Sequence, residues 1–405
     1  MLYLIAWLTD CALILFIFSA TRILAEQHAD PWTIGTLGAV FFLASAISNT
    51  IAGGLSDRIG RRIVSIAGGV GLVASLSVPL IFTDGAWRLY VAYTCVGVSV
   101  GHIYPSVIAW LSQGGGRVEA SRRFLRFGLA FNLGILGGQI GGGWLYDHVS
   151  STAPLLTAIG LAFGTVICLC LVRERLGSTA HVPSLPGFGE EPVDGTVMEG
   201  TETVGVSHAE RASARRFIRL AWLANFSGMF SMSTLWFLFP ALAVSLGIPA
   251  EQHGVVLGVG RAAVIGIYAL MHVVPAWHHR FRYSVLAQLL GLSGMILVCV
   301  GRQPAALACG VVMLSVLLAY NYFASLFYNR TGHDDRRKGA AFGLNEAFLS
   351  LGASGGSLLG GWASTGLGER APFQLAAILI AASLAVQMVW FRVGRPQSDP
   401  GIAEG

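Results

Sequence analysis

Lysine is almost absent from this sequence, and charged residues of any kind are scarce. The 405 residues include one lysine, Lys338, and only 12% are Asp, Glu, Lys or Arg, against 54% apolar residues. Ordinary soluble domains carry about twice that share of charge. The composition therefore predicts a polytopic membrane protein. We attribute the formal net charge of +5 to basic residues that flank membrane spans, and we expect no nucleic-acid partner.

Residue clusters that bind metals or nucleotides, or that carry out chemistry, are also missing. The six cysteines all lie inside apolar runs, which favours free thiols over disulfides or a metal site. The adjacent His278 and His279 do not share a helix face and make a poor metal pair. The sequence shows neither a phosphate-binding loop with its lysine nor a nucleophile constellation. We therefore expect no cofactor, no bound metal and no enzymatic activity.

Long apolar runs, separated by charged or turn-forming residues, follow one another along the sequence. A helix of about 20 apolar residues crosses the hydrocarbon core of a membrane. The first run begins almost at Met1, without the basic segment or cleavage site of a signal peptide, so we expect it to be retained. The runs predict an all-α protein with twelve spans: 2–24, 32–54, 63–83, 87–112, 124–147, 152–172, 217–246, 252–274, 283–301, 304–328, 339–364 and 371–392.

Basic residues collect at one end of these spans. If both termini are cytoplasmic, 21 of the 26 Lys and Arg residues fall in cytoplasmic breaks, while Arg261 lies within a span. Such an excess of positive charge on one side is typical of the cytoplasmic face. The preference for arginine over lysine suggests a GC-rich bacterial genome, so we expect a bacterial cytoplasmic (inner) membrane. The outer breaks hold Arg22, Arg88, Arg302 and Arg370.

A charged hairpin joins the second and third spans. Residues 53–62 read Gly-Gly-Leu-Ser-Asp-Arg-Ile-Gly-Arg-Arg, between two long apolar runs. This order resembles the signature between helices 2 and 3 of the major facilitator superfamily, a large group of secondary transporters, with Ile59 where an aromatic residue is commoner. The resemblance implies two pseudo-symmetric six-helix bundles. It also implies a cytoplasmic gate at Gly54, Asp57, Arg58, Gly60, Arg61 and Arg62.

The gate has a physical rationale in the field of a helix end. Asp57 is expected to lie against the N-terminus of the eleventh span, near residues 339–342, where the helix dipole stabilises a carboxylate. The contact would be lost when the two halves separate. The alternative is that the arginines of the hairpin only fix the topology.

The two halves of the sequence repeat each other. A shift of 218 residues aligns 133–154 with 351–372 without a gap and places Trp144 on Trp362. A duplicated six-span unit is the architecture of transporters in which two bundles rock about a central site. The polar stretch between the halves is too poor in apolar residues to fold alone. The expected organisation is a bundle at 1–173, a flexible linker at 174–213, a bundle at 214–395 and a tail at 396–405.

Glycine recurs at every fourth position in the fifth and eleventh spans. Each span reads Gly-x-x-x-Gly-x-x-x-Gly-Gly-Trp, which gives a smooth face for close helix packing in lipid. The fifth span also resembles the antiporter signature of the drug:proton branch, with Gln139 where that signature has proline. The packing glycines are Gly134, Gly138, Gly142, Gly143, Gly352, Gly356, Gly360 and Gly361.

Ionisable side chains inside spans are costly and usually face a cavity or a partner. Asp10 and His102 lie at similar depths in the first and fourth spans, which line the central cavity in the superfamily, so the resemblance implies a proton-accepting pair. A desolvated carboxylate can exchange protons near neutral pH. Alternatively, Asp10 lies near the headgroups and His102 is a buried neutral donor.

Arg261 lies near the middle of its span, where it cannot easily reach water. We expect it to pair with Glu346, to hold an anionic substrate or to bridge helices. Aromatic side chains on the cavity spans suit an amphipathic organic solute, although single aromatics also occur in interfacial belts. The candidate coupling and substrate residues are Asp10, His102, Tyr104, Asn225, Arg261, Tyr320, Tyr322 and Glu346.

Together these patterns favour a secondary active transporter, monomeric in the lipid bilayer, that moves a small organic solute by alternating access with proton coupling. One alternative is an uncoupled facilitator. Another is a transport-inactive sensor or scaffold, favoured by Gln139 and by the hairpin 277–282, which has no acidic residue. The fold serves many substrates, so these residues do not identify the solute.

Overall fold

The computed structural model describes residues 1–82, 85–111, 117–172, 208–332 and 335–393, and these are helical apart from short connections. A short 3-10 turn, η1 (Pro275–Trp277), joins two of the helices. The helices of the described residues are α1 (Leu2–Glu26), α2 (Pro31–Ile59), α3 (Arg61–Ile81), α4 (Trp87–Leu111), α5 (Arg117–His148), α6 (Ala153–Leu171), α7 (His208–Ser245), α8 (Ala250–Val273), α9 (Phe281–Val300), α10 (Pro304–Gly332), α11 (Asp335–Leu367) and α12 (Ala371–Val393).

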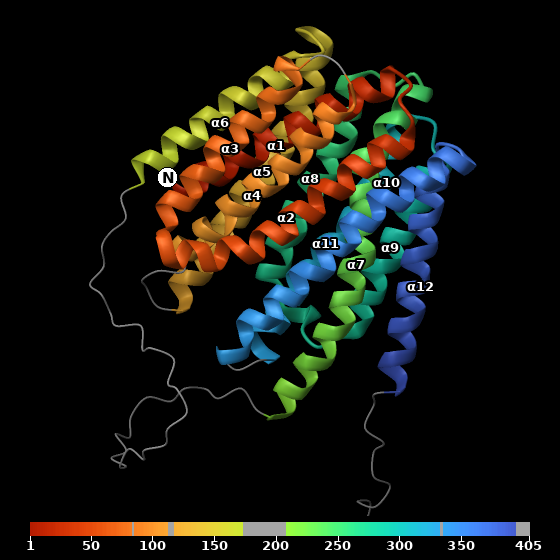
Figure 1. Ribbon diagram of the computed structural model, residues 1–405. Helices are drawn as coiled ribbons and strands as arrows, with labels where there is room; N and C mark the ends of the chain where they lie inside the picture. Colours follow the sequence, from red (N-terminus) through yellow and green to blue (C-terminus); the bar gives the residue numbers. More distant parts are fainter. Residues whose placement is uncertain (83–84, 112–116, 173–207, 333–334, 394–405) are drawn as a thin grey trace, which may run out of the picture.

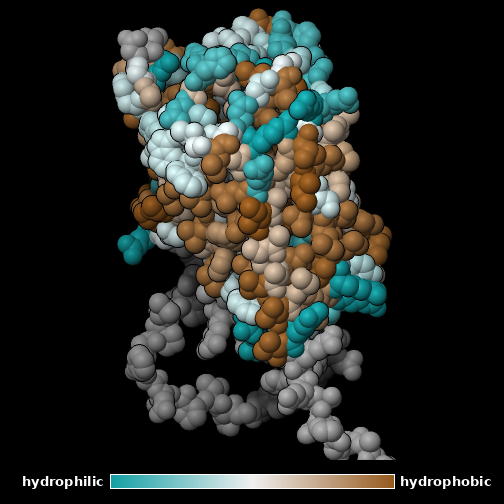
Figure 2. Space-filling model, turned by 90° about the vertical axis from the view of Figure 1, so that its right-hand side faces the viewer, coloured by the Kyte–Doolittle hydropathy of each residue, from teal (hydrophilic) through white to brown (hydrophobic). Residues whose placement is uncertain are grey.

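These helices have the dimensions and the surface of a membrane bundle. Within the described residues, 10 helices are long and apolar enough to cross a membrane. α5 and α11 lie where the fifth and eleventh spans are expected, and their many glycines, together with the serines of α11, lower their hydropathy. Figure 2 shows a broad apolar band across one face, with hydrophilic residues gathered toward both ends. This is the surface expected of a multi-pass bundle that contacts lipid around its middle.

The linker between the halves is shorter than the sequence predicts. The sequence predicts that the linker continues to residue 213, whereas α7 begins at His208. Alanine, glutamate and arginine dominate 209–216, and these good helix formers extend α7 beyond its apolar part. The rest of the predicted linker, 174–207, and the tail 396–405 lie outside the described residues.

The helices pack as two halves, each with its own buried core. Buried side chains of α1 to α6, among them Phe16 and Tyr93, form one core cluster. Those of α7 to α12 form two clusters, one around Phe239 and one around Trp277. Phe237 of α7 inserts into the first cluster, so the two cores are joined by a side chain near the middle of the bundle.

Glycine faces bring helices together within each half. A Cβ added to Gly134 of α5 would lie 2.6 Å from the backbone oxygen of Trp7 in α1. A Cβ added to Gly352 of α11 would likewise collide with the backbone of Phe226 in α7. Because the two positions are repeat mates, each half uses the same close packing to seat its first helix.

The two halves meet along two seams, α2 with α11 and α5 with α8. Figure 1 shows α2 running beside α11. Gly361 of α11 lies against the backbone of Pro31, and Gly143 of α5 against that of Ala250. These contacts lie at the end of the molecule that holds the α1–α2 and α7–α8 connections, which we call the closed end. Toward the other end of α2 and α8, Gly54 and Gly266 have no atom within 4 Å of an added Cβ.

Candidate functional site

A buried hydrogen bond joins the two halves near the middle of the bundle. Nη1 of Arg261 in α8 donates to Oδ1 of Asn132 in α5 at 3.0 Å. The guanidinium carbon lies 5.6 Å from the ring centroid of Trp236 in α7, and the arginine is only 7% exposed. A buried charge held by an amide and an aromatic face is costly to leave unpaired. Of the three roles predicted for Arg261, the structure therefore favours a bridge between helices.

Asp10 of α1 lies beside this bridge. It is 2% exposed and is close enough to Arg261 and Tyr104 to interact with them electrostatically. Within the described residues, neither its Oδ2 atom nor the Tyr104 hydroxyl has a hydrogen-bond partner of good geometry. Gly134 of α5 would place an added Cβ 3.0 Å from the Asp10 Cβ. The glycine face of α5 thus leaves the room that Asp10 occupies.

The predicted pair of Asp10 with His102 is wrong in this conformation. Nδ1 of His102 lies 2.9 Å from Oγ of Ser48 in α2 and 2.9 Å from the backbone oxygen of Val98. The Cβ of His102 faces Gly68 of α3. His102 therefore points toward α2 and α3, while Tyr104, two residues further along α4, points toward Asp10. The periodicity of α4 explains the difference, because residues two apart lie on different helix faces.

A second polar group lies in the other half around Glu346 of α11. Its Oε1 atom is 3.5 Å from the Tyr322 hydroxyl and 3.5 Å from Nδ2 of Asn345, which are long contacts. Asn225 donates to Asn345 at 3.0 Å. The glutamate side chain is exposed, in contrast to Asp10. Tyr320 is placed elsewhere: it is buried in the core cluster around Trp277.

Sequence reasoning missed Asn132, which binds Arg261, and Tyr268, which interacts electrostatically with both Arg261 and Glu346. Asn132 is 3% exposed and anchors itself by donating from Nδ2 to the backbone oxygen of Gly128 at 2.7 Å. The available signal was an amide inside the glycine-rich span, which also contains Gln139. A buried amide there needs a hydrogen-bond partner.

The charged hairpin lies at the end opposite the closed end. Gly60, between α2 and α3, has φ +100, a conformation that favours glycine. Arg61 donates from Nη1 to the backbone oxygen of Ala109 at 3.2 Å, and Arg62 donates to that of Cys170. Both arginines thus hold carbonyls at the last turns of α4 and α6, where positive charge is favourable. The side chains of Asp57 and of residues 330–343 lie outside the described part, so the gate contact stays a prediction.

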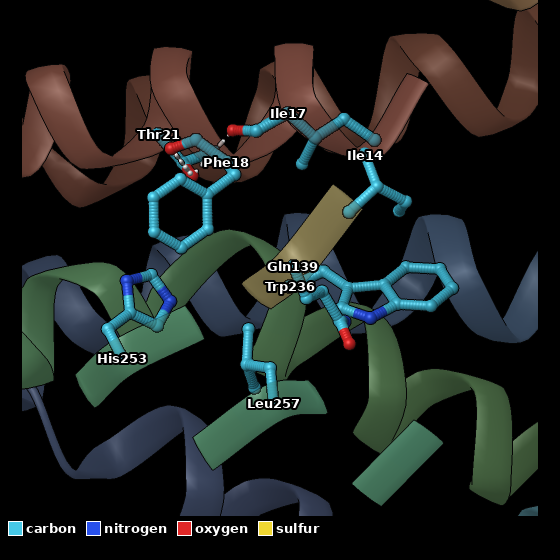
Figure 3. Close-up of a pocket in the computed structure, with 8 residues that line it drawn as sticks. All are labelled: Ile14, Ile17, Phe18, Thr21, Gln139, Trp236, His253 and Leu257. Carbon is cyan, nitrogen blue, oxygen red and sulfur yellow. Dashed lines mark hydrogen bonds between the residues drawn. The ribbon is translucent and has the colours of Figure 1, made fainter. Parts of the chain in front are cut away.

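The closed end contains a small cavity of about 10 Å³ between the two halves. His253 of α8 stacks on Phe18 of α1 at 4.6 Å between ring centroids and contacts Phe239 of α7 at 5.3 Å. Both of its ring nitrogens, and Oε1 of Gln139, are buried and without a hydrogen-bond partner among the described residues. The residues around the cavity in Figure 3 are Ile14, Ile17, Phe18, Thr21, Gln139, Trp236, His253 and Leu257.

Replacing His253 with phenylalanine is expected to stabilise this conformation. Two buried, unpaired ring nitrogens cost free energy, and an apolar ring between Phe18 and Phe239 removes that cost, for a gain of about 1–3 kcal/mol in the free energy of unfolding. Thermal unfolding of the purified protein should show a higher Tm. His272→Phe, an exposed change in the same helix, is the control and should leave the Tm almost unchanged. A lower Tm for His253→Phe would show that the nitrogens have partners.

Comparison with known proteins places this architecture among transporters. A sequence model of the Major Facilitator Superfamily matches residues 2–334. Multidrug resistance protein 1 of Bacillus subtilis (strain 168) is 22% identical over 382 residues, which cover 91% of this chain and 90% of that protein. Multidrug resistance protein MdtG of Klebsiella pneumoniae (strain 342) is 24% identical over 357 residues, covering 86% and 81%.

Solved structures show the same fold at low sequence identity. The human organic anion transporter MFSD10 (TETRAN) superimposes with a TM-score of 0.62 and 19% identity, over 95% of this chain and 97% of that one. The nucleoside transporter NupG gives a TM-score of 0.70 and 9% identity, over 96% and 98%. These likenesses describe the fold, while the sequence match extends over most of the chain. The twelve-helix architecture and the match over 2–334 together show that the chain belongs to the Major Facilitator Superfamily.

Proposed function

We propose that the protein is a secondary transporter that moves a small organic solute by alternating access and couples this movement to protons. The observation that carries the proposal is the buried group of Asp10, Arg261 and Asn132, which spans both halves near the middle of the bundle. A carboxylate inside a membrane bundle, with an arginine across the interface between two moving bodies, can link its charge to their relative position.

The coupling step is then the loss of one of two interactions that Arg261 makes with the first half. While Asp10 is charged, it attracts the Arg261 guanidinium, which also donates to Asn132. Asp10 and Asn132 both belong to the first half, so these interactions hold the two halves together at the seam between α5 and α8. Protonation of Asp10 removes this attraction and leaves Arg261 held to the first half by its hydrogen bond to Asn132. A ligand that binds one state better shifts the population toward it, and here the proton is such a ligand.

The closed end is proposed to be the outer face of a bacterial cytoplasmic membrane. The opposite end carries the hairpin with Arg58, Arg61 and Arg62, the start of α1 and the end of α12, and positive charge favours the cytoplasm. In this orientation the conformation is closed to the outside. The protein is proposed to act as a monomer, since the solute path lies between the two halves of one chain.

The solute is proposed to be an amphipathic organic molecule with an aromatic or flat apolar part. Trp222 stacks on Phe348 with ring centroids 5.7 Å apart and an interplanar angle of 10°, and Trp7 is 36% exposed. Glu346, which is exposed two residues before Phe348 in α11, offers a negative charge. Two of the relatives are named for multidrug resistance, which agrees with a site built from ring faces and few hydrogen bonds.

The test is a thermal-shift screen of purified protein against metabolites and organic drugs, followed by uptake into liposomes. A compound present at about 100 times its Kd stabilises the protein by about 2.7 kcal/mol. Hits are then loaded against an imposed pH gradient. Accumulation that follows the gradient supports proton-coupled transport. Flux that ignores the gradient supports the uncoupled facilitator, and binding without any flux supports the sensor or scaffold.

A further inference from the structure

We propose that the closed end is locked by two helix caps that the halves exchange, and that Asp147 and Thr365 set the balance between the closed and open forms of this end. The inference rests on the alternating-access function proposed above, and it assigns a positioning role to two residues outside the central site. Each of them supplies a side-chain oxygen to the first turn of a helix in the opposite half.

The first cap is at α8. Oδ2 of Asp147, near the end of α5, accepts a hydrogen bond from the backbone nitrogen of Glu251 at 2.7 Å. Glu251 is the second residue of α8, and the residue before the helix, Pro249, makes no side-chain cap. The first turn of a helix has unpaired N–H groups and a partial positive charge, so a carboxylate there is stabilising. α8 therefore obtains its side-chain cap from the other half of the molecule.

The second cap is at the start of α2. Here the second half supplies the side chain and the first half supplies the capped helix. The backbone nitrogen of Trp32, the second residue of α2, lies 3.0 Å from Oδ1 of Asp30 and 3.1 Å from Oγ1 of Thr365 in α11. The Thr365 hydroxyl donates to the same Asp30 oxygen at 2.7 Å. Here the helix has its own capping aspartate, and the residue from the opposite half reinforces it.

The two caps lie at equivalent positions in the two sequence repeats. The 218-residue shift that aligns 133–154 with 351–372 also carries Asp147 onto Thr365, while a shift of 219 carries Trp32 onto Glu251. Glycine makes both approaches possible, because an added Cβ at Gly143 or Gly361 would collide with the first turn of the partner helix. A contact that recurs at equivalent positions of both seams belongs to the architecture of the closed state.

The repeat has nevertheless diverged in a way that makes the two caps unequal. Pro249 occupies the position in α8 that Asp30 occupies in α2. When the halves separate, α2 keeps the bond that Trp32 donates to Asp30, whereas α8 loses the only side-chain cap that it has among the described residues. The bond that Glu251 donates to Asp147 and the bond that the Thr365 hydroxyl donates to Asp30 are both charge-assisted, so the two seams differ in the loss of the α8 cap and not in the kind of bond. The seam between α5 and α8 is therefore the stronger lock.

The experiment measures the distance across the closed end by electron-electron double resonance in reconstituted protein without substrate. Spin labels are placed at the exposed Ala86 and Gln303, in the α3–α4 and α9–α10 connections, after the six native cysteines are replaced with alanine. The distance needs no transport, so its outcome is separate from that of the uptake assay.

Asp147→Ala is expected to raise the ratio of long to short distances about tenfold, the effect of losing one charge-assisted hydrogen bond from the closed form only. Thr365→Val is expected to raise it about twofold, because Asp30 remains. Glu26→Gln is the matched control, since Glu26 binds Arg22 and Tyr146 within its own half at the same end, and it should leave the distances unchanged. The proposal would be overturned if correctly folded Asp147→Ala kept the parental distribution of label distances. An equal shift of the distances in Glu26→Gln would overturn it too.

A double variant separates the lock from the stability of α8. Pro249→Asp supplies α8 with the cap that α2 already has. Added to Asp147→Ala, it is expected to recover any lost thermal stability while the distances stay long. If it restores the short distance instead, the cap of α8 itself sets the closed form, and the bond between the halves does not.

Discussion

Asp10→Asn is expected to abolish solute accumulation driven by a proton gradient, with a loss of about 100-fold or more, while exchange of labelled for unlabelled solute continues. Asparagine has nearly the same shape as aspartate and fits beside Gly134 and Tyr104, but it cannot bind and release a proton. The measurement is uptake into liposomes with and without an imposed pH gradient. Exchange in the absence of a gradient reports that the site still binds and that the halves still rock.

Glu369→Gln serves as the control for this prediction, because it removes a carboxylate that is exposed at the closed end. It should leave gradient-driven accumulation within about twofold of the parent protein. Persistent accumulation by Asp10→Asn would move proton coupling to another group, with Glu346 as the next residue to change. Loss of both accumulation and exchange would indicate that Asp10 is needed for the structure of the site.

Arg261→Ala is expected to lower the initial rate of transport by about two orders of magnitude. Removing one partner of a buried charged pair costs about 3–5 kcal/mol, and here it leaves Asp10 without its cationic neighbour and Asn132 without its donor. Arg261→Lys should recover part of the activity, because an ammonium can donate to Asn132 but stacks poorly over Trp236. Initial uptake rates at several solute concentrations separate a loss of binding from a loss of turnover.

Arg282→Ala is the matched control for Arg261, since it removes an exposed arginine from the same half, and its transport should remain close to that of the parent. Asn132→Ala is expected to fall between the two, because Arg261 keeps Trp236 and the charge of Asp10. Normal transport by correctly folded Arg261→Ala would show that the hydrogen bond from Arg261 to Asn132 is not needed for transport.

The membrane fold was predictable from sequence because its signals are local. Twelve apolar runs, the hairpin at 53–62 and the repeat of Trp144 as Trp362 each lie on one stretch of chain or on two stretches related by a constant shift. The start of α7 at His208 was misplaced because charged helix formers hide a helix from a hydropathy argument.

The partners within the site were less predictable, for a different reason. Arg261 and Asp10 stood out because each is a charge in an apolar run, but Asn132 carries no such contrast. Similar depth and the cavity-lining position of the first and fourth spans in the superfamily pair His102 with Asp10, although rotation about α4 turns His102 to Ser48. Which side chains meet across a seam depends on the rotation of each helix and on the relative placement of the halves, and a single sequence states neither.

The glycine pairs of α5 and α11 give neighbouring residues different duties. Gly142 faces Phe18 inside its own half, whereas Gly143, the next residue, faces Ala250 of the other half; Gly360 and Gly361 divide in the same way between Leu238 and Pro31. Each helix thus packs against its own bundle on one face and contacts the other half of the molecule on another. Because duplication copied both faces of one ancestral helix, the molecule has two equivalent contacts between its halves, α5 with α8 and α11 with α2. A substitution at one of these contacts makes the two seams unequal in strength.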